Sequence, residues 1–228
     1  MNNLKISIAL ASFNGAQFLQ DQLASLVEQT FLPAELVVTD DGSTDETLAI
    51  LERFADVAPF PVSVHRNEQR LGYGMNFLKA ASLCSGDVIA FSDQDDVWLP
   101  AKLERLGKAF GHLQADFVAH AAEVTDARLV RTGKRYPDIG MDRYFASDEV
   151  RETFYPGFAL AVSRKFFDGV RDVMSRPGFN VEAHDELLCD LAAVSCKRCE
   201  LSESLVLYRQ HGANLIGYHG AVLLQKVA

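Results

Sequence analysis

Three aspartates stand close together in the segment Ser92-Asp93-Gln94-Asp95-Asp96, directly after the apolar residues 87–91. The apolar residues are predicted to form a strand, and in extended backbone Asp93 and Asp95 project to the same side. Carboxylates that converge without a nearby base repel one another, so a divalent cation is their natural partner. Oxygen ligands favour Mg²⁺ or Mn²⁺. One aspartate is enough to cap the helix expected after Pro100, so three favour a metal site.

A second acidic segment, residues 40–45 (DDGSTD), also follows a predicted strand, residues 35–39. A carboxylate at this position can accept a hydrogen bond from a nucleobase N–H or a ribose hydroxyl, as acidic residues do in dinucleotide-binding folds. The same residues also suit a β-turn followed by a helix that Ser43 or Thr44 would cap. From the residues alone, both interpretations stand.

A third acidic pair, Asp185 and Glu186, precedes an apolar stretch that is expected to be helical over residues 186–193. A helix N-terminus favours the ionised form of a carboxylate, which is the form that a general base needs. Helix capping is the structural alternative for Asp185 and is compatible with catalysis. Because a helix turns about 100° per residue, only one of the two acids is expected to face a pocket.

Strands and helices are predicted to alternate along the first half of the chain. Strands are expected over residues 5–11, 35–39, 62–65 and 87–91, and helices over residues 18–27, about 43–54, 75–83 and from Pro100 onward. This alternation predicts an α/β domain with a largely parallel sheet. In such sheets ligands bind beyond the carboxyl ends of the strands, which is where the first two acidic segments fall.

The pattern is looser after about residue 112. Strands are expected over residues 117–120, 158–162 and 205–208, and helices over residues 164–174 and 186–193. Residues 130–151 are polar and are expected to be irregular, as a loop over the site or as an exposed excursion.

Composition narrows the possible partners. The 228 residues fit one domain, and the formal net charge of −9 argues against nucleic acid, whose phosphates attract basic surfaces. A nucleotide remains compatible because a bound cation reverses the local charge. The N-terminus lacks the pattern of a signal peptide, and no apolar run approaches the ~20 residues of a membrane span. A cytoplasmic protein is expected, with contact at the inner face of the membrane left open.

Four cysteines include the pair Cys196 and Cys199, spaced as C-x-x-C. A zinc site needs four ligands, and a second close Cys or His pair at the usual spacing is missing from the sequence. We therefore expect free, buried or half-buried thiols in a reducing compartment.

Taken together, these segments resemble the family-2 glycosyltransferases of the inverting GT-A type. The matching pieces, in chain order, are residues 11–15 (ASFNG), 40–45 (DDGSTD), Arg66-Asn67 with Leu71-Gly72, 92–98 (SDQDDVW), 184–186 (HDE) and 208–212 (YRQHG) with Asn214. The resemblance covers about residues 5–217, and the order of the pieces is more specific than any one of them. The DQDDVW and YRQHG forms are most similar to the rhamnosyltransferase-like branch, which assembles bacterial surface polysaccharides.

The resemblance implies a GT-A fold with a mostly parallel central sheet flanked by helices. It implies one domain over residues 1–228, with a nucleotide-sugar-binding half to about residue 110 and an acceptor-binding half from about residue 111. The implied reaction moves a sugar, with rhamnose as one candidate, from a nucleoside diphosphate donor to a saccharide or lipid-linked saccharide, with inversion. Mg²⁺ or Mn²⁺ is the implied cofactor.

The resemblance also implies roles for individual residues on the donor side. Ser12, Phe13 and Asn14 are expected to line the nucleoside pocket. Asp40 or Asp41 is expected to contact the base or ribose, and Arg70 to lie against the base or a phosphate.

The remaining roles concern the metal, the diphosphate and the proton. Asp93 and Asp95 would form the D-x-D pair, with Asp95 as the more direct metal ligand. Arg209 and His211 are expected to reach the diphosphate, or the metal in the case of His211; without the resemblance, His211 would be interpreted as a hydrogen-bonded loop histidine. Asp185 would take the proton from an acceptor hydroxyl that attacks opposite the diphosphate, with Glu186 as the neighbouring alternative.

The sequence departs from the family on the acceptor side. It also disfavours two other enzyme functions. Glu186 and Leu187 stand where the family often has bulky aromatic residues, which is a departure from the family beside the proposed base. A sugar-phosphate nucleotidyltransferase would need a glycine-rich basic loop near the first strand, and a nicotinamide dehydrogenase would need G-x-G-x-x-G there; residues 12–17 (SFNGAQ) offer neither. A non-catalytic sugar-nucleotide-binding protein is the third possibility.

Overall fold

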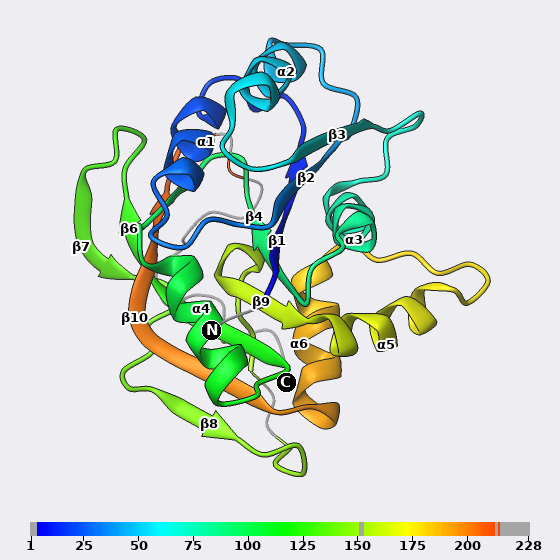
Figure 1. Cartoon of the computed structure of the whole chain (residues 1–228), viewed down its shortest axis with the longest axis vertical. Coiled ribbons are helices and arrows are strands. Elements are labelled where there is room, and N and C mark those ends of the chain that lie inside the picture. The colour runs from blue at the N-terminus through cyan, green and yellow to red at the C-terminus, as the bar shows by residue number, and fades with distance from the viewer. Residues whose placement is uncertain (1–3, 151–152, 213, 215–228) are drawn as a thin grey trace.

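A computed structural model describes residues 4–150, 153–212 and 214 of the chain, and a mixed sheet runs through its centre (Figure 1). Within these residues the sheet has ten strands in the order β3-β2-β1-β4-β9-β6-β10-β5, with β7 paired to β6 and β8 paired to β10. The strands are β1 (Ile6–Ser12), β2 (Glu35–Asp40), β3 (Val62–Arg66), β4 (Val88–Ser92), β5 (Val97–Trp98), β6 (Phe117–Thr125), β7 (Arg131–Arg135), β8 (Arg143–Phe145), β9 (Leu160–Ser163) and β10 (Arg198–Arg209).

The first four strands of the sheet order are parallel to one another. Strand β1 pairs with β2 so that Ser12 lies opposite Asp40, and with β4 so that Leu10 lies opposite Ser92. The carboxyl ends of β1, β2 and β4 therefore meet at one edge. Beyond them, β9 runs antiparallel to both β4 and β6, and β10 runs parallel to β6. The predicted α/β fold is confirmed, and the strands contributed by the second half of the chain make the sheet mixed.

Helices cover both faces of the sheet. Residues of α1 (Leu19–Val27), α2 (Thr47–Val57) and α4 (Lys102–His112) pack into one apolar core, and residues of α3 (Tyr73–Leu83), α5 (Arg164–Met174) and α6 (His184–Ser195) pack into the other. A short 3₁₀ turn, η1 (Gly157–Ala159), precedes β9.

The alternation of side chains along β1 explains the two cores. Ile6, Ile8 and Leu10 belong to one core, and Ala9 belongs to the other. Because successive side chains of a strand point to opposite faces, a strand that is buried on both faces reads as a continuous apolar run. This is the pattern of residues 5–11.

The structure corrects several expected elements. Strands β7 and β8 form within residues 130–151, which were expected to be irregular, and residues 205–208 belong to the longer strand β10. The residue that caps α2 is Glu46, without a side-chain bond, so the prediction of a cap at Ser43 or Thr44 is wrong.

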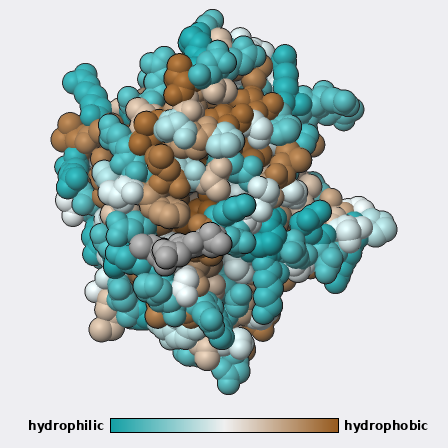
Figure 2. Space-filling view, in the orientation of Figure 1, coloured by the Kyte–Doolittle hydropathy of each residue, from teal (hydrophilic) through white to brown (hydrophobic). Residues whose placement is uncertain are grey.

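The surface is mainly polar (Figure 2), and the cysteines are unpaired, as the sequence predicted for them. Figure 2 shows polar side chains over most of one face, with apolar side chains gathered mainly in its upper half. All four cysteines are free and buried. Among the residues that the structure describes, no helix combines the length and the apolar character needed to cross a membrane.

Candidate active site

The loops that follow β1 and β2 are bonded directly to each other. The Ser12 hydroxyl donates to Asp40 Oδ2 at 2.9 Å, the Asn14 backbone N–H donates to Ser43 Oγ at 2.9 Å, and the Thr44 N–H donates to Asn14 Oδ1 at 2.9 Å. Asn14 adopts a positive φ of 48° to make these contacts, a conformation that asparagine tolerates better than most residues. Its side chain therefore joins two loops, and it does not line either cavity described below.

The loop that follows β4 is bonded to the first loop through Gln94. Its side-chain amide donates to the Phe13 carbonyl at 3.1 Å and accepts from the Phe13 N–H at 3.0 Å. A Cβ at Gly15 would lie 2.1 Å from Gln94 Oε1, so only glycine permits this approach. The sequence motifs include Gln94, but nothing in its type or spacing predicted this role.

Asp40 holds the turn after β2. Its side chain is fully buried and accepts hydrogen bonds from the Ser12 and Ser43 hydroxyls and from the backbone N–H groups of Gly42 and Ser43. These donors satisfy both carboxylate oxygens, and Asp40 lines neither cavity. The geometry thus gives Asp40 a structural role and leaves ligand contact to its neighbour.

Asp41 lies in the lining of both cavities. Its Oδ1 accepts from Asn67 Nδ2 at 2.9 Å and from the Leu71 N–H at 2.7 Å, and its Oδ2 accepts from the Gly72 N–H at 2.9 Å. Arg70 Nε lies 3.9 Å from Oδ2. Asp41 therefore fixes the loop that carries Arg70 while one edge of its carboxylate faces the cavity.

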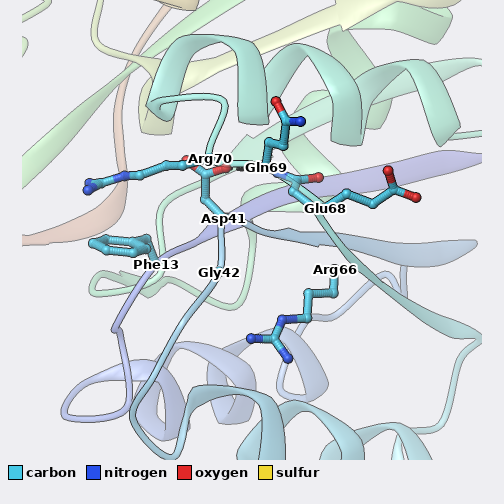
Figure 3. Close-up of a pocket in the computed structure, with 8 residues that line it drawn as sticks. Phe13, Asp41, Gly42, Arg66, Glu68, Gln69 and Arg70 are labelled. Atoms are coloured by element: carbon cyan, nitrogen blue, oxygen red, sulfur yellow. Dashed lines mark hydrogen bonds and ion pairs between the residues drawn. The ribbon is translucent and has the colours of Figure 1, made fainter.

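The first cavity, of about 480 Å³, is lined by Phe13, Asp41, Gly42 and residues 66–70. The Arg70 guanidinium lies 3.9 Å from the centroid of the Phe13 ring. Figure 3 shows Arg70 extended alongside that ring, with the side chains of Glu68 and Gln69 pointing away from it. An aromatic ring, a guanidinium and a carboxylate together can stack on a flat heteroaromatic group and bond to its N–H.

The second cavity, of about 630 Å³, shares Phe13, Asp41 and Arg70 with the first and extends to Asp93, Asp95 and Asp185. Ser12 also lines it. Much of the remaining lining is aromatic and comes from both halves of the chain: Tyr73, Phe77, Tyr136, Phe154, Phe158 and Tyr208. The cavity thus brings together residues that lie more than 90 positions apart in the sequence.

Three carboxylates meet at the edge of this second cavity. Asp93, Asp95 and Asp96 each offer an oxygen within 4.8 Å of the others. Asp96 Oδ1 accepts from the Arg209 N–H at 2.9 Å, whereas Asp96 Oδ2 is buried and has no hydrogen-bond partner within the described part of the chain. The acidic cluster is therefore wider than the predicted D-x-D pair, because it includes Asp96.

Burial and mutual repulsion dominate the electrostatics of the acidic cluster, and the charge of Lys102 opposes them only in part. Burial, followed by the neighbouring charge of Asp95, raises the pKa of Asp93 to about 8 and raises the pKa of Asp96 well above its ordinary value. Carboxylate oxygens that lie this close together, one of them without a hydrogen-bond partner in the described residues, suit a divalent cation such as Mg²⁺ or Mn²⁺. A cation would take the place of the protons that the acids otherwise hold.

His211 meets this cluster, as the resemblance implies. Its Nε2 lies 2.8 Å from Asp95 Oδ2, and its ring stacks on Phe18 with centroids 4.2 Å apart. It is therefore placed either to bind a cation with Asp95 or to hold the Asp95 carboxylate by a hydrogen bond.

The Arg209 side chain points elsewhere. Its guanidinium donates to Asp21 Oδ2 at 2.8 Å and to the Ala127 carbonyl at 3.2 Å, and it lies 4.7 Å from the Phe18 ring centroid. Arg209 is buried and lines neither cavity, and only its backbone N–H contacts the acidic cluster. Arg209 was expected to reach the diphosphate. Its guanidinium instead binds Asp21 on α1 and points away from the acidic cluster.

Asp185 lies in the first turn of α6 and faces the second cavity. Its Oδ2 accepts from the Gly157 N–H at 3.2 Å and its Oδ1 from the Glu186 N–H at 3.1 Å. Burial raises its pKa, and these backbone bonds only partly oppose that rise. The helix N-terminus was expected to favour ionisation, but desolvation outweighs it. The residue that caps α6 is Ala183, whereas Glu186 is exposed and lies outside both cavities.

Two tyrosines beside Asp185 were not predicted from the sequence. Burial, and then the charge of Asp185, raises the pKa of Tyr73 to about 12 and raises the pKa of Tyr136 above its ordinary value. Tyr73 begins α3, and Tyr136 follows β7 in the stretch expected to be irregular. His184 is also buried here against Phe77, with ring centroids 4.1 Å apart, and burial lowers its pKa to about 3, so that its ring is neutral.

Comparison with known sequences gives a family match. Residues 7–171 match the family described as Glycosyl transferase family 2. An uncharacterised glycosyltransferase of Nostoc sp. is 28% identical over 220 residues, which cover 92% of this chain and 66% of that protein. The dTDP-rhamnosyl transferase RfbG of Shigella flexneri is 35% identical over 99 residues, which cover 42% of this chain and 34% of that protein. The chain thus spans less than two thirds of the length of these relatives.

Comparison with solved structures gives the same fold. The structure of Staphylococcus aureus TarS 1-349 in complex with UDP-GlcNAc superposes with a TM-score of 0.75 at 20% identity, covering 92% of this chain and 60% of that one. The mannosyltransferase PcManGT from Pyrobaculum calidifontis, in complex with GDP-Man and Mn²⁺, gives a TM-score of 0.65 at 16% identity and covers 92% of this chain and 57% of that one. The fold is therefore of the GT-A type, as expected.

Proposed function

The chain belongs to glycosyl transferase family 2, and from this membership we propose that it transfers a sugar from a nucleoside diphosphate donor to a hydroxyl group of an acceptor. The acceptor is a saccharide or a lipid-linked saccharide, the anomeric configuration inverts, and Mg²⁺ or Mn²⁺ takes part. The observation that carries the proposal is the second cavity, in which Asp93, Asp95 and Asp185 line one space that adjoins the Phe13 and Asp41 pocket.

The nucleoside of the donor would bind in the first cavity. The Phe13 ring and the Arg70 guanidinium, which stack on each other, would offer their outer faces to the base. Asp41 Oδ2, which accepts one backbone N–H, would also accept from a base N–H or a ribose hydroxyl. Two structural neighbours were solved with UDP-GlcNAc and with GDP-Man, so this kind of donor suits the fold. The partial match to a dTDP-rhamnosyl transferase makes rhamnose the candidate sugar.

The diphosphate would lie at the acidic cluster. Asp93, Asp95 and Asp96, with His211, would hold the cation, and a cation bound there would neutralise charge that forms on the departing diphosphate. Support for Mn²⁺ comes from the neighbour solved with Mn²⁺ and from the three converging carboxylates. Without a cation, the negative cluster would repel the donor.

Asp185 would accept the proton of the acceptor hydroxyl as that oxygen attacks the anomeric carbon. Burial raises the pKa of Asp185 and makes its carboxylate a stronger base, while the Gly157 and Glu186 N–H groups hold it in place. Attack from the side opposite the diphosphate inverts the configuration.

The aromatic lining of the second cavity is the proposed acceptor subsite. The sequence around Asp185 lacks the bulky aromatics frequent in the family, but Tyr136, Phe154 and Tyr208 approach from other parts of the chain. Aromatic side chains with a few polar groups are typical of pockets for small ligands. Apart from His211, the donor-side residues precede residue 110, whereas Tyr136, Phe154 and Tyr208 follow it, which supports the proposed division into a donor half and an acceptor half. A cytoplasmic location stays a prediction.

The test is turnover with a panel of UDP-, dTDP- and GDP-sugars in the presence of Mn²⁺, measured first as donor hydrolysis by water. We expect Asp185→Asn to lower the rate by ~10²–10⁴-fold, because it removes the proton acceptor and keeps the side-chain shape. Affinity for the nucleoside diphosphate should stay close to that of the wild type.

Glu186→Gln is the matched control, because this acid is adjacent but exposed. An inactive Glu186→Gln beside a fully active Asp185→Asn would assign the base to Glu186. Full activity of both variants would refute a carboxylate base, and a wild-type protein that turns over none of the donors would count against the proposed transfer.

A further inference from the structure

A lysine lies fully buried beneath the acidic cluster. Lys102, in the first turn of α4, has no exposed surface, and its ammonium lies 3.6 Å from the Trp98 ring centroid. Lysine is almost never fully buried unless it is paired. Burial lowers its pKa, and the charges of Asp96 and Asp93 oppose that effect. A lysine at this place therefore needs a reason beyond packing.

Lys102 is hydrogen-bonded to Phe158, a residue that lines the second cavity. Its Nζ donates to the Phe158 carbonyl at 2.8 Å, and Phe158 is the central residue of the η1 turn. The residue before it, Gly157, donates its N–H to Asp185 Oδ2 at 3.2 Å. A short path thus runs from the lysine through the backbone of Phe158 and Gly157 to the proposed base.

The η1 turn has little freedom to move toward α6. A Cβ at Gly157 would lie 2.4 Å from His184 Nε2, so the glycine backbone sits directly against the first turn of that helix. A shift of the turn would therefore alter the surroundings of His184 and Asp185 together. The Lys102 bond is a contact that can hold the turn from the opposite side.

We propose that Lys102 is a positioning residue for the transfer reaction: through the Phe158 carbonyl it fixes the η1 turn, and the turn in turn fixes Asp185 relative to the metal-binding carboxylates. The inference rests on the proposed function, because it assigns Asp185 the role of base. Lys102 contacts neither donor nor acceptor in this account, since it lines neither cavity. Its effect on the reaction acts through geometry.

Lys102→Met tests this inference, because methionine keeps the length and apolar stem but cannot donate to Phe158. We expect the donor-hydrolysis rate to fall by about 10–100-fold, the size of loss that a small misplacement of a catalytic group causes. The affinity for UDP with Mn²⁺, measured by calorimetry, should stay within about threefold of the wild type. Lys108→Met, on the same helix but half exposed, is the matched control and should match the wild type in both measurements.

A double-mutant cycle separates positioning from a general loss of structure. If Lys102 acts through Asp185, then Lys102→Met should add little to the loss already caused by Asp185→Asn, because coupled residues are not additive. Multiplication of the two losses would overturn the inference. A parallel fall of UDP–Mn²⁺ affinity and rate in Lys102→Met would also overturn it, because the lysine would then support the acidic turn.

Crystal structures of the wild type and of the variant provide a test that does not depend on turnover. We expect the Gly157–Asp185 contact to lengthen in Lys102→Met and to persist in Lys108→Met. An unchanged turn and an unchanged Asp185 would refute the inference, even if the wild type turned over none of the donors and the proposed function failed separately. If Lys102→Met does not fold, Lys102→Leu, which is also apolar and cannot donate to the Phe158 carbonyl, takes its place in every measurement.

Discussion

Asp40 ends β2 and Asp96 follows β4 at the same edge of the sheet, and both aspartates are fully buried, yet their surroundings differ. Asp40 accepts four hydrogen bonds, from two hydroxyls and two backbone N–H groups. Asp96 accepts one backbone N–H and keeps a buried oxygen without a partner in the described residues, next to two further acids. The same side chain is thus satisfied within the chain in one turn and left incomplete in the other.

This difference separates a structural acid from a binding acid. A buried charge is tolerated when donors surround it, and it is costly when they are missing. The turn at residues 40–45 has donors from its own chain and orders two loops. The turn at residues 92–96 has fewer donors and leaves Asp96 Oδ2 without one in the described residues, so a cation from outside is the group that would complete it. A substitution in the turn at residues 40–45 should therefore act mainly on stability, and one in the turn at residues 92–96 mainly on cation-dependent binding.

The largest expected effect is on stability and concerns Asp40. Asp40→Ala leaves hydroxyl and N–H donors unpaired in the core, and hydrogen bonds to a charged group contribute about 1.5–3 kcal/mol each. We expect a loss of roughly 3 kcal/mol or more in the free energy of unfolding, measured by denaturant titration. Asp56→Ala, on the exposed face of α2, is the control and should change little. A stable Asp40→Ala variant would show that its bonds do not hold the turn.

The second effect is on binding and concerns Asp95. Asp95→Ala should weaken the Mn²⁺-dependent binding of UDP by about 100-fold, since even the partners of metal ligands contribute 10–100-fold to affinity. The free energy of unfolding without metal should change little, because the substitution relieves repulsion within the acidic cluster and also removes the contact with His211. Calorimetry and denaturant titration give the two quantities. A variant that melts well below the wild type with its affinity preserved would make Asp95 structural.

The smallest effect is the pH dependence of stability without metal. The pKa of Asp93 is raised to about 8 in the folded protein, so its folded-state proton is bound more tightly than in the unfolded chain. Such a group contributes its full stabilisation below the unfolded pKa near 4, and this contribution is lost as the pH rises through about 8. We expect metal-free stability to decline over this window, and Asp93→Asn to reduce the decline. Identical pH profiles for both proteins would contradict the raised pKa.

The fold of the first half could be predicted because β1, β2 and β4 are mainly apolar and almost entirely buried, and the turns that follow them carry Gly, Asp and Asn. The second half was harder. Strand β7 (Arg131–Arg135) is polar and mostly exposed, so it has no hydrophobic alternation to detect. The cap of α2 was wrongly predicted because the Ser43 hydroxyl bonds to Asp40 and accepts from Asn14 instead.

The candidate site was predictable where residue type fixed the chemistry and unpredictable where the direction of a side chain fixed it. Asp93, Asp95 and His211 come together as the motifs implied. Arg209 instead binds Asp21, a residue 188 positions away, and no local pattern reports such a contact. The burial of Lys102 is likewise a property of the packed core, although a lysine beside the apolar residues of α4 is a faint signal.

The central claim is that the acidic cluster binds a nucleoside diphosphate through a divalent cation. The most direct measurement is calorimetric titration of UDP, dTDP and GDP into the wild-type protein at pH 8, once with Mn²⁺ and once with excess EDTA. The account predicts that at least one nucleotide binds with Mn²⁺ and that its binding is lost in EDTA. Equal affinity with and without the metal would contradict it.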